Sequence, residues 1–133
     1  MDRKRSAILR VESDNLSVEQ ISEIVGDVPD RYLRKGEIGR NPHRPLKDTT
    51  WELREDVPGE EYLELALERL WPRILPLESG MKELSRKGCF LRLAIVQRIS
   101  AADPHGPGFG LKVEELRFLA DIGAILDIDQ YAD

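Results

Sequence analysis

Apolar and polar residues alternate in four stretches of the chain, which predicts four strands. The stretches are residues 6–12, 49–54, 89–100 and 124–131. The third is the clearest, because Leu91, Leu93 and Ile95 share one face, whereas the other face includes the charged residues Arg92 and Arg98. Successive side chains of a strand point to opposite faces, so this pattern indicates strands with one apolar and one polar face.

A short motif recurs near the two ends of the chain. The sequence Leu-Ser-Val-Glu-Gln-Ile at 16–21 reappears as Leu-Lys-Val-Glu-Glu-Leu at 111–116. In the first copy, Ser17 and Gln20 form a capping box, the pair in which each side chain bonds the other residue's backbone N–H, so a helix is expected to begin there. The second copy predicts a helix over residues 113–122. Two similar β-α-β units are therefore expected.

The middle of the chain is expected to hold a pair of helices. Apolar residues at helical spacing run from about Tyr62 to Trp71. Pro58 is expected at the first helical position, where its missing N–H costs little, and Pro72 is expected to stop the helix. A shorter helix follows and is expected to end at Gly88.

The order of these elements predicts one α+β domain over residues 1–133. Two β-α-β halves joined by the helical pair give about four strands. Because each strand has one charged face, helices should cover only one side of an antiparallel or mixed sheet. A two-layer ferredoxin-like sandwich fits this order best. The inward residues expected to form its core are Trp51, Leu91, Leu93, Ile95, Leu126 and Ile128.

Composition narrows the class of protein. The chain has 133 residues, of which 41% are hydrophobic and 34% charged, as is typical of a globular protein. No apolar run approaches the length of a membrane span, and no secretory signal follows the charged start. The single cysteine, Cys89, excludes an internal disulfide, and its place at the start of an apolar run favours a buried thiol. A cytoplasmic protein without a membrane association is expected.

Charge is distributed unevenly along the chain. The net charge is −5, which argues against general nucleic-acid binding. Residues 28–47 nevertheless hold six basic and two acidic side chains, so this stretch is positive and the remainder is strongly negative. Such asymmetry suggests an acidic partner or an anion rather than nucleic acid in general.

The basic stretch is a candidate binding site. Residues 27–47 hold three prolines and two glycines without a sustained period, which predicts a long loop. Structureless loops of this length are usually functional or disordered. The alternative is a solubilising loop that pairs with the acidic helix carrying Glu60, Glu61, Glu64 and Glu68. The residues expected to bind an anion or an acidic partner surface are Arg31, Arg34, Lys35, Arg40, His43 and Arg44.

Two carboxylates form a candidate metal site. Asp127 and Asp129 lie two apart on a predicted strand, so both project from one face and could hold a divalent cation. The alternative is a charged strand face that opposes edge-to-edge aggregation. His43 and His105 lie in loops without a cluster of further ligands, and the glycine-rich stretch 105–110 matches no phosphate-binding motif. No catalytic residue and no cofactor are expected.

Three features of the sequence resemble a known family. They are the Arg34-Lys35-Gly36-Glu37 segment, the isolated Trp51, and the C-terminal pattern that ends in Asp127-Ile128-Asp129-Gln130-Tyr131. Together they resemble the bacterial family called domain of unknown function 4279, over nearly the whole chain. The resemblance implies a stand-alone bacterial protein and supplies no catalytic residue.

Three functions are compatible with these features. The first and favoured one is a non-catalytic module that binds a protein partner, for instance an immunity protein that neutralises a toxin. The second is a metal-dependent enzyme that uses Asp127 and Asp129. The third is a small-molecule sensor that dimerises through its sheet. The sequence leaves the oligomeric state open.

Overall fold

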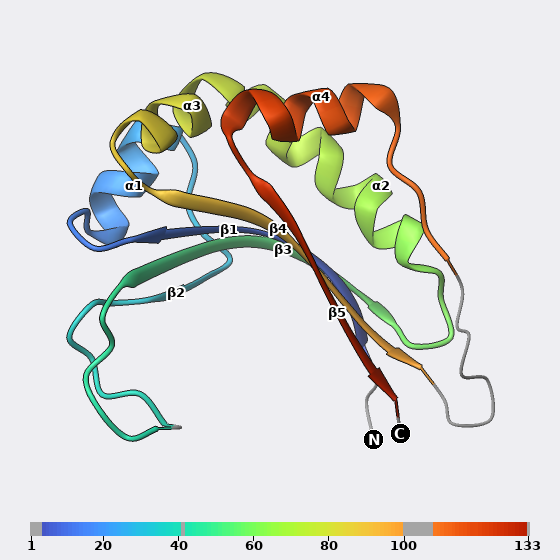
Figure 1. Ribbon diagram of the computed structural model, residues 1–133, viewed down its shortest axis with the longest axis horizontal. Helices are drawn as coiled ribbons and strands as arrows, with labels where there is room; N and C mark the ends of the chain where they lie inside the picture. Colours follow the sequence, from blue (N-terminus) through green and yellow to red (C-terminus); the bar gives the residue numbers. More distant parts are fainter. Residues whose placement is uncertain (1–3, 41, 100–107, 133) are drawn as a thin grey trace.

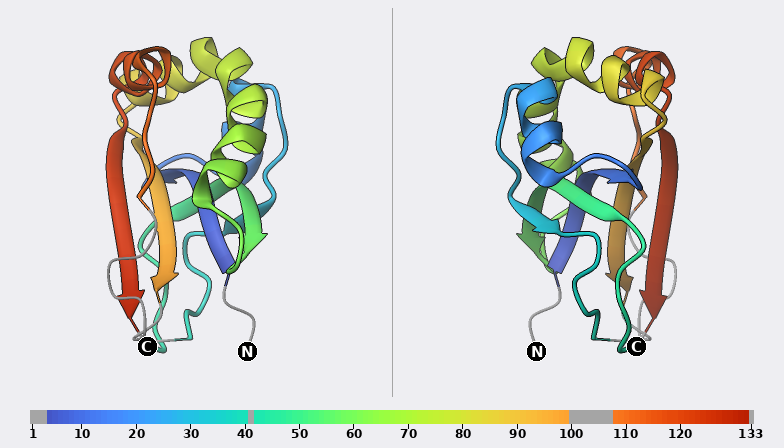
Figure 2. Two further views of the ribbon diagram at one scale, coloured as in Figure 1. Left: turned by 90° about the vertical axis from the view of Figure 1, so that its right-hand side faces the viewer. Right: turned by 90° about the vertical axis from the view of Figure 1, so that its left-hand side faces the viewer.

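A twisted sheet forms one layer of the molecule, and the helices cover one of its faces (Figures 1 and 2). The structure is a computed structural model that describes residues 4–40, 42–99 and 108–132. The predicted α+β class is confirmed. The elements are β1 (Lys4–Ser13), α1 (Val18–Val25), β2 (Arg31–Leu33), β3 (Thr49–Pro58), α2 (Leu63–Ile74), η1 (Leu75–Leu77), α3 (Glu78–Arg86), β4 (Phe90–Ile99), α4 (Val113–Ile122) and β5 (Ile125–Ala132).

The strands of the described residues form one mixed sheet in the order β2-β3-β1-β4-β5. β1 is antiparallel to both of its neighbours, β3 and β4, and β2 is antiparallel to β3. β4 and β5 are parallel, so α4 provides the crossover that a parallel pair requires. The sheet has five strands rather than about four, because β2 lies in the stretch that was expected to be a loop.

The two predicted β-α-β halves begin alike but differ in topology. Gln20 N–H donates to Ser17 Oγ at 3.1 Å, and Ser17 N–H donates to Gln20 Oε1 at 2.8 Å. In the second copy, Lys112 N–H donates to Glu115 Oε1 at 2.6 Å. However, β1 and β3 are antiparallel neighbours, whereas β4 and β5 are parallel. The repeat therefore marks two helix starts and not two copies of one fold.

The apolar core lies between the sheet and the helices. Trp51, Leu91, Leu93 and Ile95 are buried as expected. α2 packs across β1 and β3, and α1 packs against β3 and α3. The Trp51 indole N–H also donates to Ser22 Oγ at 3.0 Å, which joins β3 to α1. Because the core occupies the face of the sheet toward the helices, the opposite face is the one available for contacts with other molecules.

The last strand departs from the expected core. Leu126 and Ile128 are 41% and 47% exposed. β5 is an edge of the sheet, and the helical layer covers its start rather than its length (Figure 1). The prediction that both residues are buried was wrong, because alternation alone does not distinguish an edge strand from a central one.

Two prolines occupy positions other than those expected. Pro58 is the last residue of β3, opposite Lys4, rather than the first residue of a helix. Pro72 lies inside α2, which continues to Ile74. A proline in the last turn removes one backbone hydrogen bond, and the burial of Ile74 holds that turn in place. The second helix of the pair, α3, ends before Gly88 as predicted.

Candidate functional site

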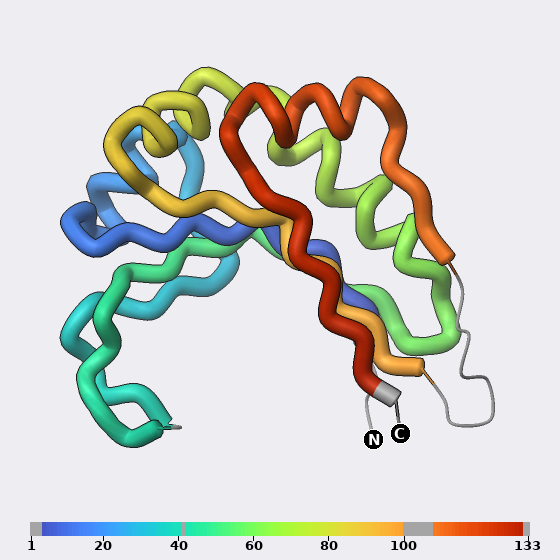
Figure 3. Tube along the Cα trace, in the orientation of Figure 1, coloured from blue at the N-terminus to red at the C-terminus, as the bar shows by residue number. Residues whose placement is uncertain are grey.

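The basic stretch is an ordered part of the fold. Its first residues form β2, which pairs with β3. Residues 34–40 and 42–48, here called the basic hairpin, fold back on themselves below the sheet, away from the helices (Figure 3). The prediction of one long loop was wrong, because a three-residue edge strand is too short to show alternation. The hairpin is closed by hydrogen bonds from Gly36 N–H to Leu46 O (2.9 Å), Leu46 N–H to Glu37 O (2.8 Å) and Gly39 N–H to Arg44 O (2.9 Å).

The face of the sheet that the helices leave uncovered, here called the open face, carries charged side chains. On β3, Trp51 and Leu53 face the helices, so the alternate residue Glu52 points the other way. Glu52 stands directly opposite Arg10 of β1 on one side and Arg31 of β2 on the other. The strand order therefore brings charges together from segments far apart in the sequence.

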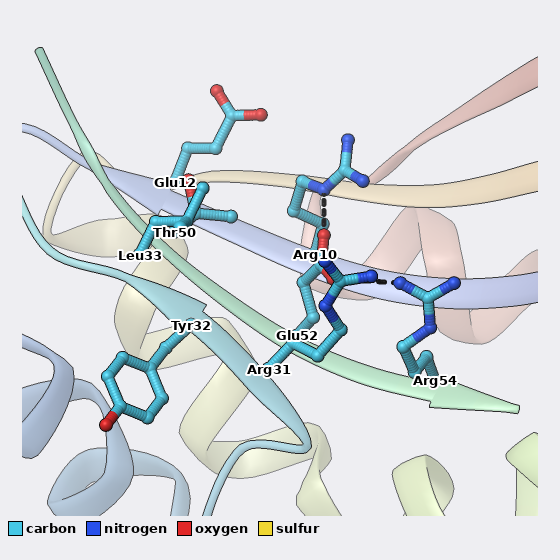
Figure 4. Close-up of a pocket in the computed structure, with 8 residues that line it drawn as sticks. All are labelled: Arg10, Glu12, Arg31, Tyr32, Leu33, Thr50, Glu52 and Arg54. Atoms are coloured by element: carbon cyan, nitrogen blue, oxygen red, sulfur yellow. Dashed lines mark hydrogen bonds and ion pairs between the residues drawn. The ribbon is translucent and has the colours of Figure 1, made fainter. Parts of the chain in front are cut away.

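A cavity of about 330 Å³ opens on this face (Figure 4). It is here called the arginine pocket. Figure 4 shows the guanidinium groups of Arg10, Arg31 and Arg54 around Glu52, while the Tyr32 ring points away from them. The pocket is lined by Arg10, Glu12, Arg31, Tyr32, Leu33, Thr50, Glu52 and Arg54.

Glu52 holds two of the three arginines in place. Its side chain is only 9% exposed, and its Oε2 accepts from Arg10 Nε at 2.5 Å. Its Oε1 lies 3.5 Å from an Nη of Arg54. A carboxylate with two guanidinium partners fixes both groups, because charge-assisted bonds are strong where solvent is largely excluded. Glu52 therefore organises the pocket.

Arg31 differs from the other two arginines. Its side chain is exposed, and it forms no ion pair with any residue within 4–40, 42–99 and 108–132. It stands directly across the strand pair from Glu52, whose carboxylate is already bound by Arg10 and Arg54. Among the arginines of the pocket, Arg31 is thus the one without an ion pair to a described residue, and its hydrogen-bond donors are available to a ligand.

A second network lies beside the pocket on the same face. Arg54 bonds Asp56 at 3.0 Å, and Ser6 Oγ–H donates to the same carboxylate. Burial alone would raise the pKa of Asp56, but the hydrogen bonds from Ser6 and Arg54 outweigh it and hold the pKa below its usual value. Asp56 therefore helps to fix Arg54 at the wall of the pocket.

The basic hairpin lines a larger cavity of about 820 Å³. Arg31 and Leu33 line both this cavity and the arginine pocket, so the two spaces are adjacent. Arg40 and Arg44, two of the predicted binding residues, line the larger cavity. His43 is exposed on the same hairpin, outside that lining.

Arg34 and Lys35 lie on another side of the hairpin, next to α1. An Nη of Arg34 bonds Glu19 at 2.8 Å, and this contact lowers the pKa of Glu19 and raises the pKa of Arg34. Lys35 Nζ donates to Asp14 O at 2.6 Å. These two residues are thus already used in tethering the hairpin, and the structure does not place them with Arg31.

The hairpin makes no ion pair with the acidic residues of the α2 region among the residues that the structure describes. Its ion pair with Glu19 of α1 is the one observed. α2 lies on the helical side of the sheet, whereas the hairpin projects below the open face (Figure 1). The alternative in which the loop pairs with Glu60, Glu61, Glu64 and Glu68 was therefore wrong.

Asp127 and Asp129 both lie on the open face of β5, at the far edge of the sheet from the hairpin. Asp127 is bound by Arg92 at 3.1 Å, and Arg92 also bonds Glu12 at 2.9 Å. Within the described part of the chain, no group of three His, Cys, Asp or Glu residues is placed to hold a metal ion. His105 lies outside the described residues. The structure places no third ligand beside Asp127 and Asp129 among the described residues, so the metal site stays a prediction.

Of the eight residues that line the pocket, Arg31 alone was singled out from the sequence. Five of the others are polar residues of β1 and β3, namely Arg10, Glu12, Thr50, Glu52 and Arg54. Their signal was present as the polar positions of two alternating strands. That signal becomes specific only when β1, β2 and β3 are known to be neighbours in the order β2-β3-β1.

The fold and the site define a small α+β protein with an arginine-lined pocket on a helix-free sheet face. The chain belongs to the family described as Domain of unknown function (DUF4279), whose model matches residues 3–133. The resemblance noted in the sequence is thereby confirmed. Neither the curated proteins nor the solved structures contain a significant match. Among the described residues, no helix is both long enough and apolar enough to cross a membrane.

Proposed function

We propose that this protein is a non-catalytic binding module that holds an acidic segment of a partner protein on the basic hairpin and the open face. The observation that carries this proposal is Arg31, an exposed guanidinium with no ion pair among the described residues, at the junction of two cavities. An acidic segment would supply the carboxylate that Arg31 lacks.

The charge distribution supports this choice of partner. The chain carries a net charge of −5, yet residues 34–48 hold five Lys or Arg residues against Glu37 and Asp48. A basic surface on an otherwise acidic protein attracts an acidic partner to one place and repels it elsewhere. Immunity against a toxin is one form that such a module can take.

The state of the pocket carboxylates favours binding over acid–base chemistry. Glu52 is bound by Arg10 and Arg54, and Glu12 is bound by Arg92. The oxygens of these carboxylates are thus already occupied as hydrogen-bond acceptors, whereas fixed guanidinium groups are good anion receptors. The metal-dependent enzyme and the sheet-dimerising sensor remain hypotheses without a supporting contact of this kind.

The finer fold type and the cell compartment are also proposals. The order and directions of β2-β3-β1-β4, with crossovers on one face, support a ferredoxin-like sandwich to which β5 is added. A buried free thiol at Cys89 supports a reducing compartment such as the bacterial cytoplasm.

The test is a titration of the isotope-labelled protein with a short, capped Glu-rich peptide, followed by NMR. We expect the resonances of β2 and the basic hairpin to shift, and the affinity to fall steeply as salt screens the charges. Arg40→Gln with Arg44→Gln should weaken binding about ten-fold, because two exposed cations are removed. Arg86→Gln on α3, which removes a cation paired with Glu83, is the matched control and should bind as the wild type does.

A different map of shifts would contradict the proposal. If the peptide moves only resonances of the helical layer, or moves none at millimolar concentration, the hairpin is not a binding surface for acidic segments.

A further inference from the structure

The charges of the arginine pocket leave a small positive excess. Three guanidinium groups, those of Arg10, Arg31 and Arg54, line it together with the carboxylates of Glu12 and Glu52. The lining residues therefore sum to one positive charge, and Arg31 is the lining cation that forms no ion pair with any described residue. A ligand with one negative charge neutralises the net charge of the lining residues. A ligand with two negative charges leaves a net negative charge and is repelled by the nearby carboxylates of Glu12 and Glu52.

The geometry assigns the excess to one residue. Arg10 is fixed by Glu52, and Arg54 by Glu52 and Asp56. Arg31 projects into the same space from the adjacent strand β2 (Figure 4). The Thr50 hydroxyl lies in the same lining and offers a further hydrogen-bond donor.

We infer that the arginine pocket seats one carboxylate of the partner segment, gripped by Arg31, and that Glu52 sets a preference for this monoanion over a phosphate dianion. The inference deepens the proposed function and rests on it. A planar carboxylate matches the fork of a guanidinium in a bidentate pair. Glu52 acts here as a positioning residue, because it holds Arg10 and Arg54 and supplies the negative charge that disfavours a dianion.

The apolar part of the site fits a carboxylate on an aliphatic stem. Leu33 lines the pocket and is 50% exposed, so it is available to cover the methylene groups of a Glu side chain. Leu33 and Arg31 also line the hairpin cavity, which continues toward Arg40, Arg44 and Lys47. The seated carboxylate thus belongs to the end of an acidic segment whose next acidic residues lie along the basic hairpin.

The experiment compares three short peptides that are capped at both ends and differ at one position, which is Glu, Gln or phosphoserine. Their affinities for the full chain are measured by isothermal titration calorimetry at low salt. For the wild type we expect the Glu peptide to bind about ten-fold more tightly than the Gln peptide, because only the former supplies a charged partner for Arg31. The phosphoserine peptide should bind more weakly than the Glu peptide.

Variants separate the roles of the two residues. Arg31→Gln should abolish the preference for Glu over Gln, and Arg31→Lys should retain only part of it, because lysine offers no fork. Arg86→Gln is the control, since Arg86 pairs with Glu83 on α3, away from the pocket and the hairpin. Glu52→Gln should shift the ratio of the two affinities toward phosphoserine about ten-fold, because one repelling charge is removed.

The shift of this ratio distinguishes a charge role from a structural one, because a loosened fold weakens both anionic peptides alike. If Glu52→Gln unfolds, Glu12→Gln removes the other lining carboxylate and should shift the ratio in the same direction. Equal binding of the Glu and Gln peptides by the wild type, a wild-type preference for phosphoserine, or an unchanged preference in Arg31→Gln would overturn the inference. If the Glu peptide still shifts the hairpin resonances in Arg31→Gln with its preference intact, the proposed function survives and only the pocket assignment fails.

Discussion

At the scale of single residues, one buried hydrogen bond connects the sheet to the first helix. Trp51 is fully buried, and its indole N–H is bonded to Ser22 Oγ. A buried donor that loses its acceptor costs more free energy than the bond itself contributes. The pair therefore has a thermodynamic signature that can be measured.

We expect Trp51→Phe to lower the free energy of unfolding by about 1–3 kcal/mol, because it removes both ring volume and the hydrogen bond. Ser22→Ala should cost about 1–2 kcal/mol, since it leaves the indole N–H without its partner. In urea titrations, the double variant should cost less than the two single variants together. Strictly additive losses would show that the two groups are not coupled.

A second residue-scale prediction concerns the thiol. Cys89 is 8% exposed, and burial raises its pKa above the usual value in spite of a hydrogen bond with Ser13. Because the thiolate is the reactive form, iodoacetamide should alkylate the native protein at neutral pH at least about ten-fold more slowly than a cysteine peptide. The rate should rise with pH as the thiolate forms, and it should match the peptide in denaturant. Rapid alkylation of the native chain would contradict this picture.

At the scale of elements, α3 approaches α1 closely enough to require a glycine. A Cβ built on Gly80 would lie 2.7 Å from the backbone oxygen of Ile24 and 2.8 Å from the Cα of Val25. Both neighbours are backbone atoms and cannot move aside as a flexible side chain would. The contact between the two helices therefore depends on the absence of a side chain at this position.

Gly80→Ala should accordingly reverse the usual effect of such a change. Alanine in place of glycine normally favours a helix by up to about 1 kcal/mol. Here we expect a loss of about 1–3 kcal/mol, because the methyl group forces the helices apart. Gly110→Ala is the control, since a Cβ there meets nothing within 4 Å. Chemical denaturation of both variants measures the difference, and a stabilised Gly80→Ala would show that α1 and α3 separate easily.

The elements that could be predicted from the sequence are those whose local pattern and tertiary environment agree. α1 begins at its capping box, and β4 buries Leu91, Leu93 and Ile95 between two strands. The predictions were wrong where contacts with neighbouring elements, rather than the local sequence, determine the structure. β2 is too short to show a period, and Ile128 is apolar but lies on an edge. The alternation of apolar and polar residues indicates which face of a strand is apolar, but it does not indicate whether another element covers that face.

At the scale of the whole molecule, the sequence alone could locate only part of the candidate site. Arg31 was expected because it lies in a basic stretch. Arg10, Glu52 and Arg54 belong to alternating strands, where charged residues are usual and carry no special signal. They become a pocket only through the pairing of β1, β2 and β3, which is determined by packing between distant segments and is not encoded in any one of them.

The outer edge of β5 gives a prediction about self-association. In an antiparallel pairing of two copies centred on Ile128, Asp127 of each copy faces Asp129 of the other on the same side of the sheet. Centring on either aspartate places it opposite itself. Like charges directly opposite each other are unfavourable, so these residues oppose dimerisation of an edge that also exposes Leu126.

The double variant Asp127→Asn with Asp129→Asn should therefore self-associate at concentrations where the wild type is monomeric. Sedimentation velocity over a concentration series measures this, and Asp121→Asn on the exposed side of α4 is the matched control. An unchanged sedimentation coefficient in the double variant would mean that the charges do not protect the edge.

The central place of β1 has a consequence for how the chain is made. β1 leaves the ribosome before both of its neighbours in the sheet, β3 and β4. Until β4 emerges, β1 lacks one of the two strands that flank it in the sheet. Pairing β1 with β3 and β4 brings together segments that are far apart in the sequence, and forming such contacts costs chain entropy. We therefore expect folding to be slower than that of a helical protein of the same length.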